Sequence, residues 1–201
     1  MFPRGLLIGL SIAAPVGPIG ILCIRRTLRD GRLAGFVSGL GAATADGLYG
    51  AVAAFGLTAI SDALVTYQTL LRVVGGAFLV GLGARILITS ARQPDENPDA
   101  KRRSLLSAYG TTFVLTVSNP LTILSFAALF TGLGLVSRGS GGAGIVVLGV
   151  FFGSALWWLV LSFISGLLRR HATAAMIWIN RISGTLIVGF GVFVLLSLAQ
   201  S

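Results

Sequence analysis

The chain has 201 residues, of which 55% are hydrophobic and 10% are charged, and its formal net charge is +9. Soluble domains carry about 25% charged residues, so this composition excludes an ordinary soluble domain and indicates an integral membrane protein. The positive charge does not indicate nucleic-acid binding, because the basic residues lie between apolar runs, as they do in the cytoplasmic loops of membrane proteins.

Six apolar runs are long enough to cross a bilayer, because about 20 helical residues span the hydrocarbon core. They cover residues 5–24, 34–57, 68–90, 108–135, 142–168 and 176–199. A charged linker with two prolines, residues 91–107, divides the single transmembrane domain into halves of about 1–90 and 108–201. We therefore predict an all-α membrane protein with six transmembrane helices.

The first run contains the sequence Ala14-Pro15-Val16-Gly17-Pro18-Ile19-Gly20, which is expected to interrupt its helix. Each proline removes an amide donor and clashes with the preceding turn. Within hydrocarbon, an interrupted helix is tolerated only where protein or a water-filled cavity surrounds the free backbone groups. Transporters place substrate and ion sites at such interruptions, so this segment is the first candidate site.

A second interruption is predicted in the fourth run, at Ser118-Asn119-Pro120. The Asn119 amide can both donate and accept hydrogen bonds there, and Ser118 and Thr122 add hydroxyl groups. Each half has an odd number of spans, so the two halves cross the membrane in opposite directions. Pro18 and Pro120 occupy corresponding positions of the two halves, which favours an inverted repeat with broken first and fourth helices.

Spans three and six support the same repeat, because four residues of one recur in the other at a constant offset of 108. Glycine is abundant in the chain, so some of these matches arise by chance. The residues are Gly76, Val80, Gly81 and Gly83 in the third span and Gly184, Val188, Gly189 and Gly191 in the sixth.

Asp46 is the only acidic residue that falls inside a predicted span. A carboxylate at the bilayer centre costs about 2.5–3.5 kcal/mol on insertion scales. Small residues at helical spacing (Gly35, Gly39, Ala42 and Gly50) place Asp46 on a face that other helices can approach closely. The functional interpretation is a site for a proton, a cation or a substrate ammonium group; the structural one is a hydrogen bond between helices.

The basic residues set the predicted orientation, because cytoplasmic loops are enriched in lysine and arginine. The first, third and fifth loops are rich in basic residues, whereas the second and fourth together contain only Arg138. Both termini are therefore expected outside the cell, and residues 91–107 in the cytoplasm. The basic residues of the odd loops are Arg25, Arg26, Arg29, Arg32, Arg92, Lys101, Arg102, Arg103, Arg169 and Arg170.

The sequence does not favour an enzyme. It has one histidine, one cysteine and one acidic residue within a span, too few for a metal site or a catalytic triad. The glycine-rich segment 139–144 lacks the Lys-Ser/Thr of a phosphate-binding loop. We therefore expect no metal, no cofactor and no nucleic-acid partner, and any active transport must draw on an ion gradient or a partner subunit.

Several of these features together resemble the LysE/RhtB family of bacterial amino-acid exporters over nearly the whole chain. They are the length of about 200 residues with six spans, Pro15-Val16-Gly17-Pro18 in the first span, Asp46-Gly47 in the second and Asn119-Pro120 in the fourth. The resemblance implies a multi-pass protein of the bacterial cytoplasmic (inner) membrane. It further implies export of amino acids or similar small solutes by a secondary, proton-coupled mechanism.

The expected mechanism brings the two interruptions together near the middle of the membrane. Backbone amides at Gly17, Ile19 and Gly20 would face a substrate carboxylate. Asp46 would alternate between a proton and the substrate ammonium group. The candidate residues for substrate binding or ion coupling are Pro15, Gly17, Pro18, Ile19, Gly20, Asp46, Ser118, Asn119, Pro120 and Thr122.

Other readings remain open from the sequence. A membrane structural or accessory subunit would use Asp46 only for helix assembly, and a passive channel is disfavoured because the prolines and small residues suggest a moving core. The expected partners are a small-molecule substrate, a proton or another coupling ion and the surrounding lipid, and a homodimer is one assembly to consider. The substrate's identity is not fixed by the sequence.

Overall fold

A computed structural model describes residues 1–15, 17–55, 66–88, 98–119, 122, 125–126 and 142–200 of the chain. All regular structure in these residues is helical. In chain order the elements are α1 (Phe2–Ala13), α2 (Pro18–Asp30), α3 (Arg32–Ala54), α5 (Gln68–Ile88), α6 (Pro98–Val117), α8 (Ala143–Leu167), α9 (Arg169–Leu196) and the 3-10 helix η1 (Ser197–Gln200).

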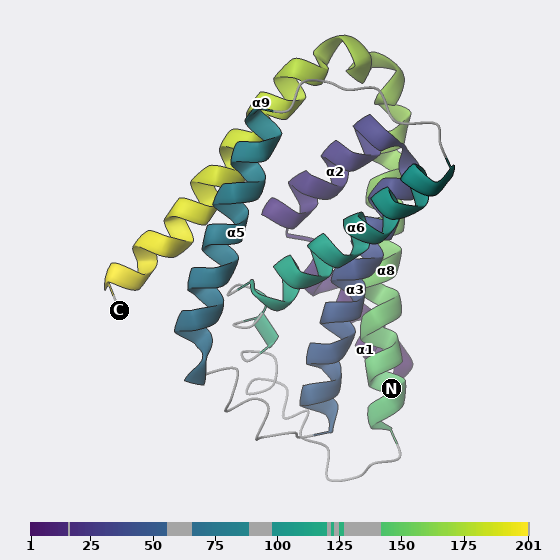
Figure 1. Cartoon of the computed structure of the whole chain (residues 1–201). Helices are drawn as coiled ribbons and strands as arrows, with labels where there is room; N and C mark the ends of the chain where they lie inside the picture. Colours follow the sequence, from purple (N-terminus) through teal and green to yellow (C-terminus); the bar gives the residue numbers. More distant parts are fainter. Residues whose placement is uncertain are drawn as a thin grey trace.

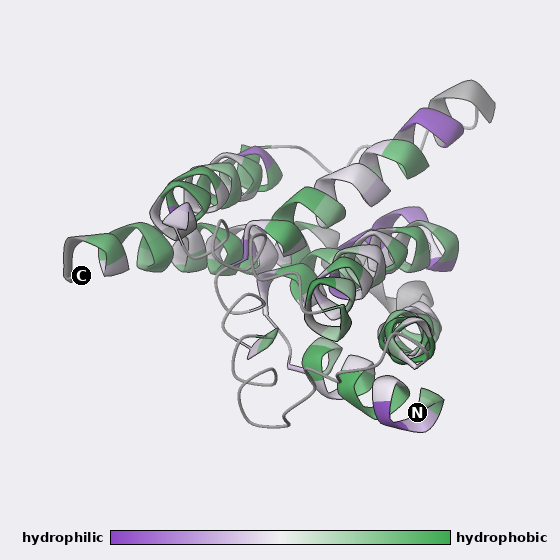
Figure 2. Ribbon diagram, turned by 90° about the horizontal axis from the view of Figure 1, so that it is seen from below, coloured by the Kyte–Doolittle hydropathy of each residue, from purple (hydrophilic) through white to green (hydrophobic). Residues whose placement is uncertain are grey.

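The helices form a bundle around α2, which lies between the α5–α9 pair and the α3–α8 pair (Figure 1). Leu22 and Cys23 of α2 are buried in the main core with Trp158 of α8 and Ile187 of α9. Many large apolar side chains instead remain exposed on the outer helix faces, among them Phe193. Figure 2 shows hydrophobic residues along most of the helices, as expected for helices that contact lipid.

The predicted interruption of the first run is present. α1 ends at Ala13, α2 begins at Pro18, and the two helices are bent by 84° at this break. Proline is favoured at the first position of a helix, because the amide it lacks would have no partner there. The proline-containing segment that ends α1 therefore also begins α2, in a new direction.

Three helices of the described residues are long and apolar enough to cross a membrane: Thr69–Ile88, Ala143–Leu167 and Ile177–Leu196. The bent pair α1–α2 is a fourth if it counts as one span. α3 has sufficient length, but its glycines and Asp46 make it less apolar than these three. This difference fits its position, since α3 packs against α2, α6 and α8.

Helix α6 begins earlier than the fourth predicted run, 108–135, and ends where an interruption of that run was predicted. It begins at Pro98, inside the segment for which the sequence indicated a linker, because hydropathy marks only the apolar part of a helix and α6 starts with a polar turn. It ends at Val117, directly before the predicted break at Asn119. Pro120 lies outside the described residues.

The assignment of Arg25 and Arg26 to a loop is wrong. α2 continues to Asp30, and Gly31, with a φ of 99° that favours glycine, is the only residue between α2 and α3. The Arg25 Nε donates to Asn180 Oδ1 of α9 at 2.9 Å. Charge alone indicated a solvated loop, but an arginine can be buried when acceptors from other helices meet its guanidinium group.

Arg26 connects α2 to two further helices. Its Nη1 donates to Ser38 Oγ of α3 and, in α6, to Ala108 O and Thr112 Oγ1, each at 2.9 Å. Together with Arg25, this side chain ties the C-terminal half of α2 to α3, α6 and α9.

Contacts between α5 and α9 occur in related pairs. Adding 108 to the number of the α5 residue and subtracting 108 from that of the α9 residue converts one contact of a pair into the other. Gly83 lies against Val188, and Gly191 lies against Val80. In each case a Cβ atom on the glycine would lie within 3 Å of the backbone nitrogen of the valine. The small residues therefore allow the two backbones to approach closely, as is common between membrane helices.

Candidate functional site

A cavity of about 330 Å³ lies where the α1–α2 break meets α3, α8, α9 and the end of α6. This volume is at the lower end of the range for small-molecule sites, about 300–1,000 Å³. The walls are mostly apolar, with a few polar groups from α3 and the region after α6. The lining residues are Ile12, Ala13, Pro15, Gly17, Pro18, Ile19, Gly20, Ala42, Asp46, Thr116, Asn119, Thr122, Ser125, Trp158 and Phe190.

The first turn of α2 lines the cavity with Pro18, Ile19 and Gly20. Gly17 is the N-cap residue and provides no side-chain cap. The hydrogen bond from Ile21 N to Gly17 O, at 3.1 Å, is the first of this helix, so the amides of Ile19 and Gly20 precede it. A helix start of this kind attracts anionic groups, because its amides and its dipole both favour negative charge.

Asp46 also lines this cavity, from the middle of α3. Only 3% of its surface is exposed, and its Oδ2 accepts a hydrogen bond from Ser154 Oγ of α8 at 2.7 Å. Ser154 Oγ in turn accepts a hydrogen bond from Trp158 Nε1 at 3.1 Å. Of the described residues that line the cavity, Asp46 is the only one with a charged side chain.

The small residues predicted to surround Asp46 bring α8 close to α3. A Cβ atom on Gly39 would collide with Trp158, whose side chain lies over this glycine, and one on Gly50 would touch Val150. The sequence therefore indicated the correct face of α3, and the structure identifies α8 as the helix that packs there.

The end of α6 contributes Asn119 to the cavity, and Thr122 follows it there. Beyond Val117 the chain turns, with Asn119 N donating to Thr116 O at 3.2 Å. The Val117 carbonyl accepts a hydrogen bond from Tyr49 Oη of α3 at 2.6 Å. A side chain from α3 thus satisfies a backbone group that the end of the helix leaves without a helical partner.

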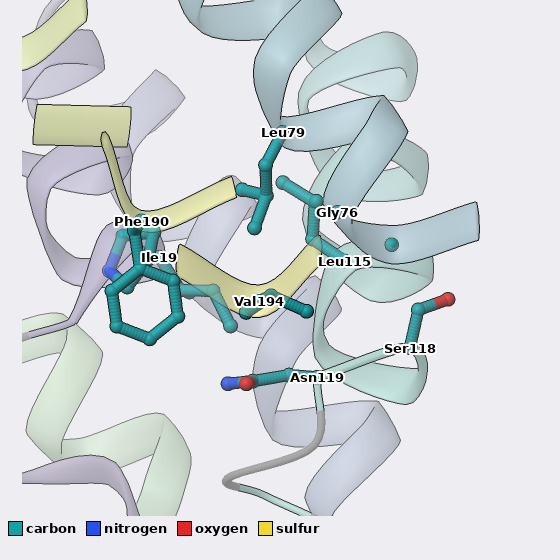
Figure 3. A pocket seen from close by; sticks show the side chains of 10 residues that line it. Ile19, Gly76, Leu79, Leu115, Ser118, Asn119, Phe190 and Val194 are labelled. Carbon is teal, nitrogen blue, oxygen red and sulfur yellow. The ribbon is translucent and has the colours of Figure 1, made fainter. Parts of the chain in front are cut away.

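Ser118 does not line this cavity. It borders a smaller neighbouring cavity of about 10 Å³, together with Pro18, Ile19 and Asn119. Figure 3 shows the Ser118 hydroxyl pointing away from the Asn119 amide, with Leu79, Leu115 and Val194 between the helices. Of the candidate residues, Pro15, Gly17, Pro18, Ile19, Gly20, Asp46, Asn119 and Thr122 line one cavity, Ser118 is displaced from it, and Pro120 lies outside the described residues.

Sequence reasoning did not identify Ser154 or Phe190 as part of this region, and Trp158 could be assigned from the sequence either to packing or to the lining of a pore. One signal for Ser154 was available, since it lies 108 residues after Asp46, the offset that relates the glycines of α5 and α9. Phe190 has no comparable signal, because an apolar residue in an apolar helix looks the same whether it faces lipid or a cavity.

The model of the LysE type translocator family matches residues 10–198. The chain belongs to this family. The resemblance found in the sequence is thereby confirmed at the level of the family.

Two curated relatives share part of the chain. The "Putative amino acid efflux protein YcgF" of Bacillus subtilis (strain 168) is 31% identical over 130 residues, which are 65% of this chain and 62% of that protein. The "Uncharacterized membrane protein YahN" of Escherichia coli (strain K12) is 28% identical over 112 residues, 54% of this chain and 49% of that protein. The chain thus spans less than two thirds of each relative's length. No solved structure matches it.

Proposed function

We propose that this protein exports amino acids or similar small solutes across the bacterial cytoplasmic (inner) membrane as a secondary transporter coupled to protons. One observation carries the proposal: the start of α2, the end of α6 and Asp46 line the same cavity, although they are far apart in the sequence. The name of the Bacillus relative, which refers to amino acid efflux, supports the substrate class.

The helix start and the acidic side chain that line the cavity suit the two charged groups of an amino acid. The Ile19 and Gly20 amides would bind the carboxylate, and Asp46 would bind the ammonium group. The apolar side chains of Trp158 and Phe190 would contact the remainder of the substrate.

Proton coupling would take place at Asp46. Its carboxyl group can hold a proton, or release it and pair with the substrate's ammonium group. Because no other acidic side chain of the described residues lines the cavity, proton and substrate would compete for one group. Such competition couples the movement of one to the opposite movement of the other.

The proposal includes six spans arranged as two inverted three-helix repeats. The paired contacts between α5 and α9 support it, and so does a second pair of contacts, one between α3 and α6 and the other between α8 and α1. Gly41 of α3 lies against Phe113 of α6, and Gly149 of α8 lies against Gly5 of α1. Adding 108 to the numbers of the α1 and α3 residues, and subtracting 108 from the others, converts one contact into the other. The proposed orientation keeps both termini outside and residues 91–107 in the cytoplasm.

The test is transport by purified protein in liposomes with an imposed pH gradient and a panel of labelled amino acids. We expect gradient-driven flux from wild type and none from Asp46→Asn, which keeps an acceptor for Ser154 but cannot exchange a proton. The matched control is Asp30→Asn, since Asp30 lies at the end of α2 and pairs with Arg29 at 2.9 Å. Absence of flux for every substrate would favour an accessory subunit, and normal flux in Asp46→Asn would exclude coupling at this residue.

A further inference from the structure

The hydrogen bonds at Asp46 form a chain with a fixed direction. Trp158 Nε1 lies 3.1 Å from Ser154 Oγ, and Ser154 Oγ lies 2.7 Å from Asp46 Oδ2. The indole N–H can only donate, so it donates to the serine oxygen. The serine hydroxyl has one proton, and that proton is left to point at the carboxylate.

Burial makes this direction strict. Ser154 is fully buried, and neither Trp158 nor Asp46 has more than 4% of its surface exposed. For groups so deeply buried an unmade hydrogen bond is costly, so we expect these bonds to be kept. Among the described residues, no side chain donates such a hydrogen bond to the other carboxylate oxygen of Asp46, Oδ1.

We propose that Trp158 and Ser154 are positioning residues that reserve Oδ2 of Asp46 for the serine and leave Oδ1 as the atom that receives the proton or the substrate's ammonium group. This inference rests on the proposed function and extends it to two further residues, one with a hydroxyl group and one with an indole. Ser154 acts on Asp46 directly, whereas Trp158 acts through Ser154.

The consequence for pH dependence follows from the direction of the bonds. A donor to the carboxylate favours its charged form, so loss of the Ser154 hydroxyl lets Asp46 keep its proton to higher pH. Loss of the Trp158 N–H frees the serine hydroxyl to turn away. We expect this to shift the pH at which Asp46 loses its proton in the same direction, and by less.

The other titratable groups near Asp46 are held by partners of their own or lie on other turns. Tyr49, one turn later on α3, donates to Val117 O, and Tyr109 of α6 donates to Thr44 Oγ1. The α8 helix carries no titratable side chain.

The nearest cations of α2 are bound elsewhere: Arg25 donates to Asn180, and Arg26 donates to Ser38, about 12 Å from Asp46 along α3. Cys23 of α2 is a buried thiol, and Arg181 of α9 lies over Trp178. The site thus has one acid whose protonation the two positioning residues control.

Infrared titration of the purified protein in lipid tests the inference without any transport assay. The difference between wild type and Asp46→Asn identifies the carboxyl band of Asp46. We expect Ser154→Ala to raise the midpoint of this band's titration by about one pH unit. Trp158→Phe should raise it by less, and the double variant should match Ser154→Ala alone, because the tryptophan acts through the serine.

Two matched controls lie on the same helix. Ser162→Ala removes a buried hydroxyl that has no hydrogen-bond partner among the described residues, and Trp157→Phe alters the neighbouring indole. Both should leave the midpoint unchanged. An unshifted midpoint in Ser154→Ala overturns the inference, and a double variant whose shift is the sum of the single shifts overturns the indirect role of Trp158.

Liposome transport separates this inference from the proposed function. If wild type transports, the pH at which flux is half-maximal should move with the infrared midpoint in Ser154→Ala. If wild type transports nothing, the proposed function fails, while the infrared titration still decides whether Trp158 and Ser154 act on Asp46.

Discussion

The contact between Gly39 and Trp158 offers a way to disturb the cavity without changing any hydrogen-bonding group. An alanine at position 39 would place its Cβ in collision with Trp158 Cβ and 2.5 Å from Trp158 Cγ, whereas ordinary contacts begin at 3.4 Å. Because the collision includes the first atom of the side chain, the backbone of α8 at Trp158 must move together with the ring, by about 0.9 Å or more. Such a displacement would disturb the position of Trp158 beside Ser154 and Asp46, where the bond from Trp158 to Ser154 is 3.1 Å long.

We expect Gly39→Ala to lower transport about tenfold or more, because misplacement of site groups by about 1 Å can cost up to a hundredfold in rate. Its stability should fall by about 1–3 kcal/mol from overpacking, offset in part by the better helix propensity of alanine, about 1 kcal/mol. Initial rates of gradient-driven flux in liposomes measure the first effect, and thermal unfolding in detergent measures the second.

The matched control is Gly47→Ala on the same helix, where an added Cβ would lie 3.5 Å from Phe151 Cβ, an ordinary contact. This variant should transport and unfold like wild type. Wild-type transport by Gly39→Ala would show that the position of Trp158 does not matter to the site. A loss of transport equal in both variants would point instead to the flexibility of α3.

Three further predictions test the architecture. Alanine at Gly83 and alanine at Gly191, two close-packed glycines related by the repeat, should destabilise the protein by similar amounts, about 1–3 kcal/mol in thermal unfolding. Alanine at Gly81 or Gly189, which have open space beside them, should not. Unequal losses would argue against the repeat. In intact cells, an impermeant thiol reagent should label a cysteine at Ser201 but not at Ala100; the reverse pattern would invert the orientation. Arg26→Met should lower the unfolding free energy by about 2 kcal/mol or more, because Ser38 loses its buried donor, and unchanged stability would show that these bonds contribute little.

The sequence located the features that depend on local chemistry. Pro15 and Pro18 fix the break between α1 and α2 because proline acts on its own turn of helix. The small residues around Asp46 fix its face of α3, because helical spacing alone decides which residues share a face. These inferences needed no knowledge of the neighbouring helices.

Features that depend on distant partners were beyond the same reasoning. Arg25 and Arg26 read as loop residues because their acceptors come from α3, α6 and α9. The start of α6 at Pro98 was missed because hydropathy reports lipid contact and not helix length. Trp158 could be packing or lining until the helix opposite it was known. In each case the deciding contact joins segments far apart in the sequence.

The relation between Asp46 and Ser154 explains why one acid is enough for the proposed mechanism. The offset of 108 exchanges these two residues with each other, so their hydrogen bond lies where the two halves meet. Two carboxylates so close would repel, and one would stay protonated. A hydroxyl in the second half instead donates to the acid and adds no charge. On this mechanism the central position holds one exchangeable charge, for which a single proton and a single ammonium group compete.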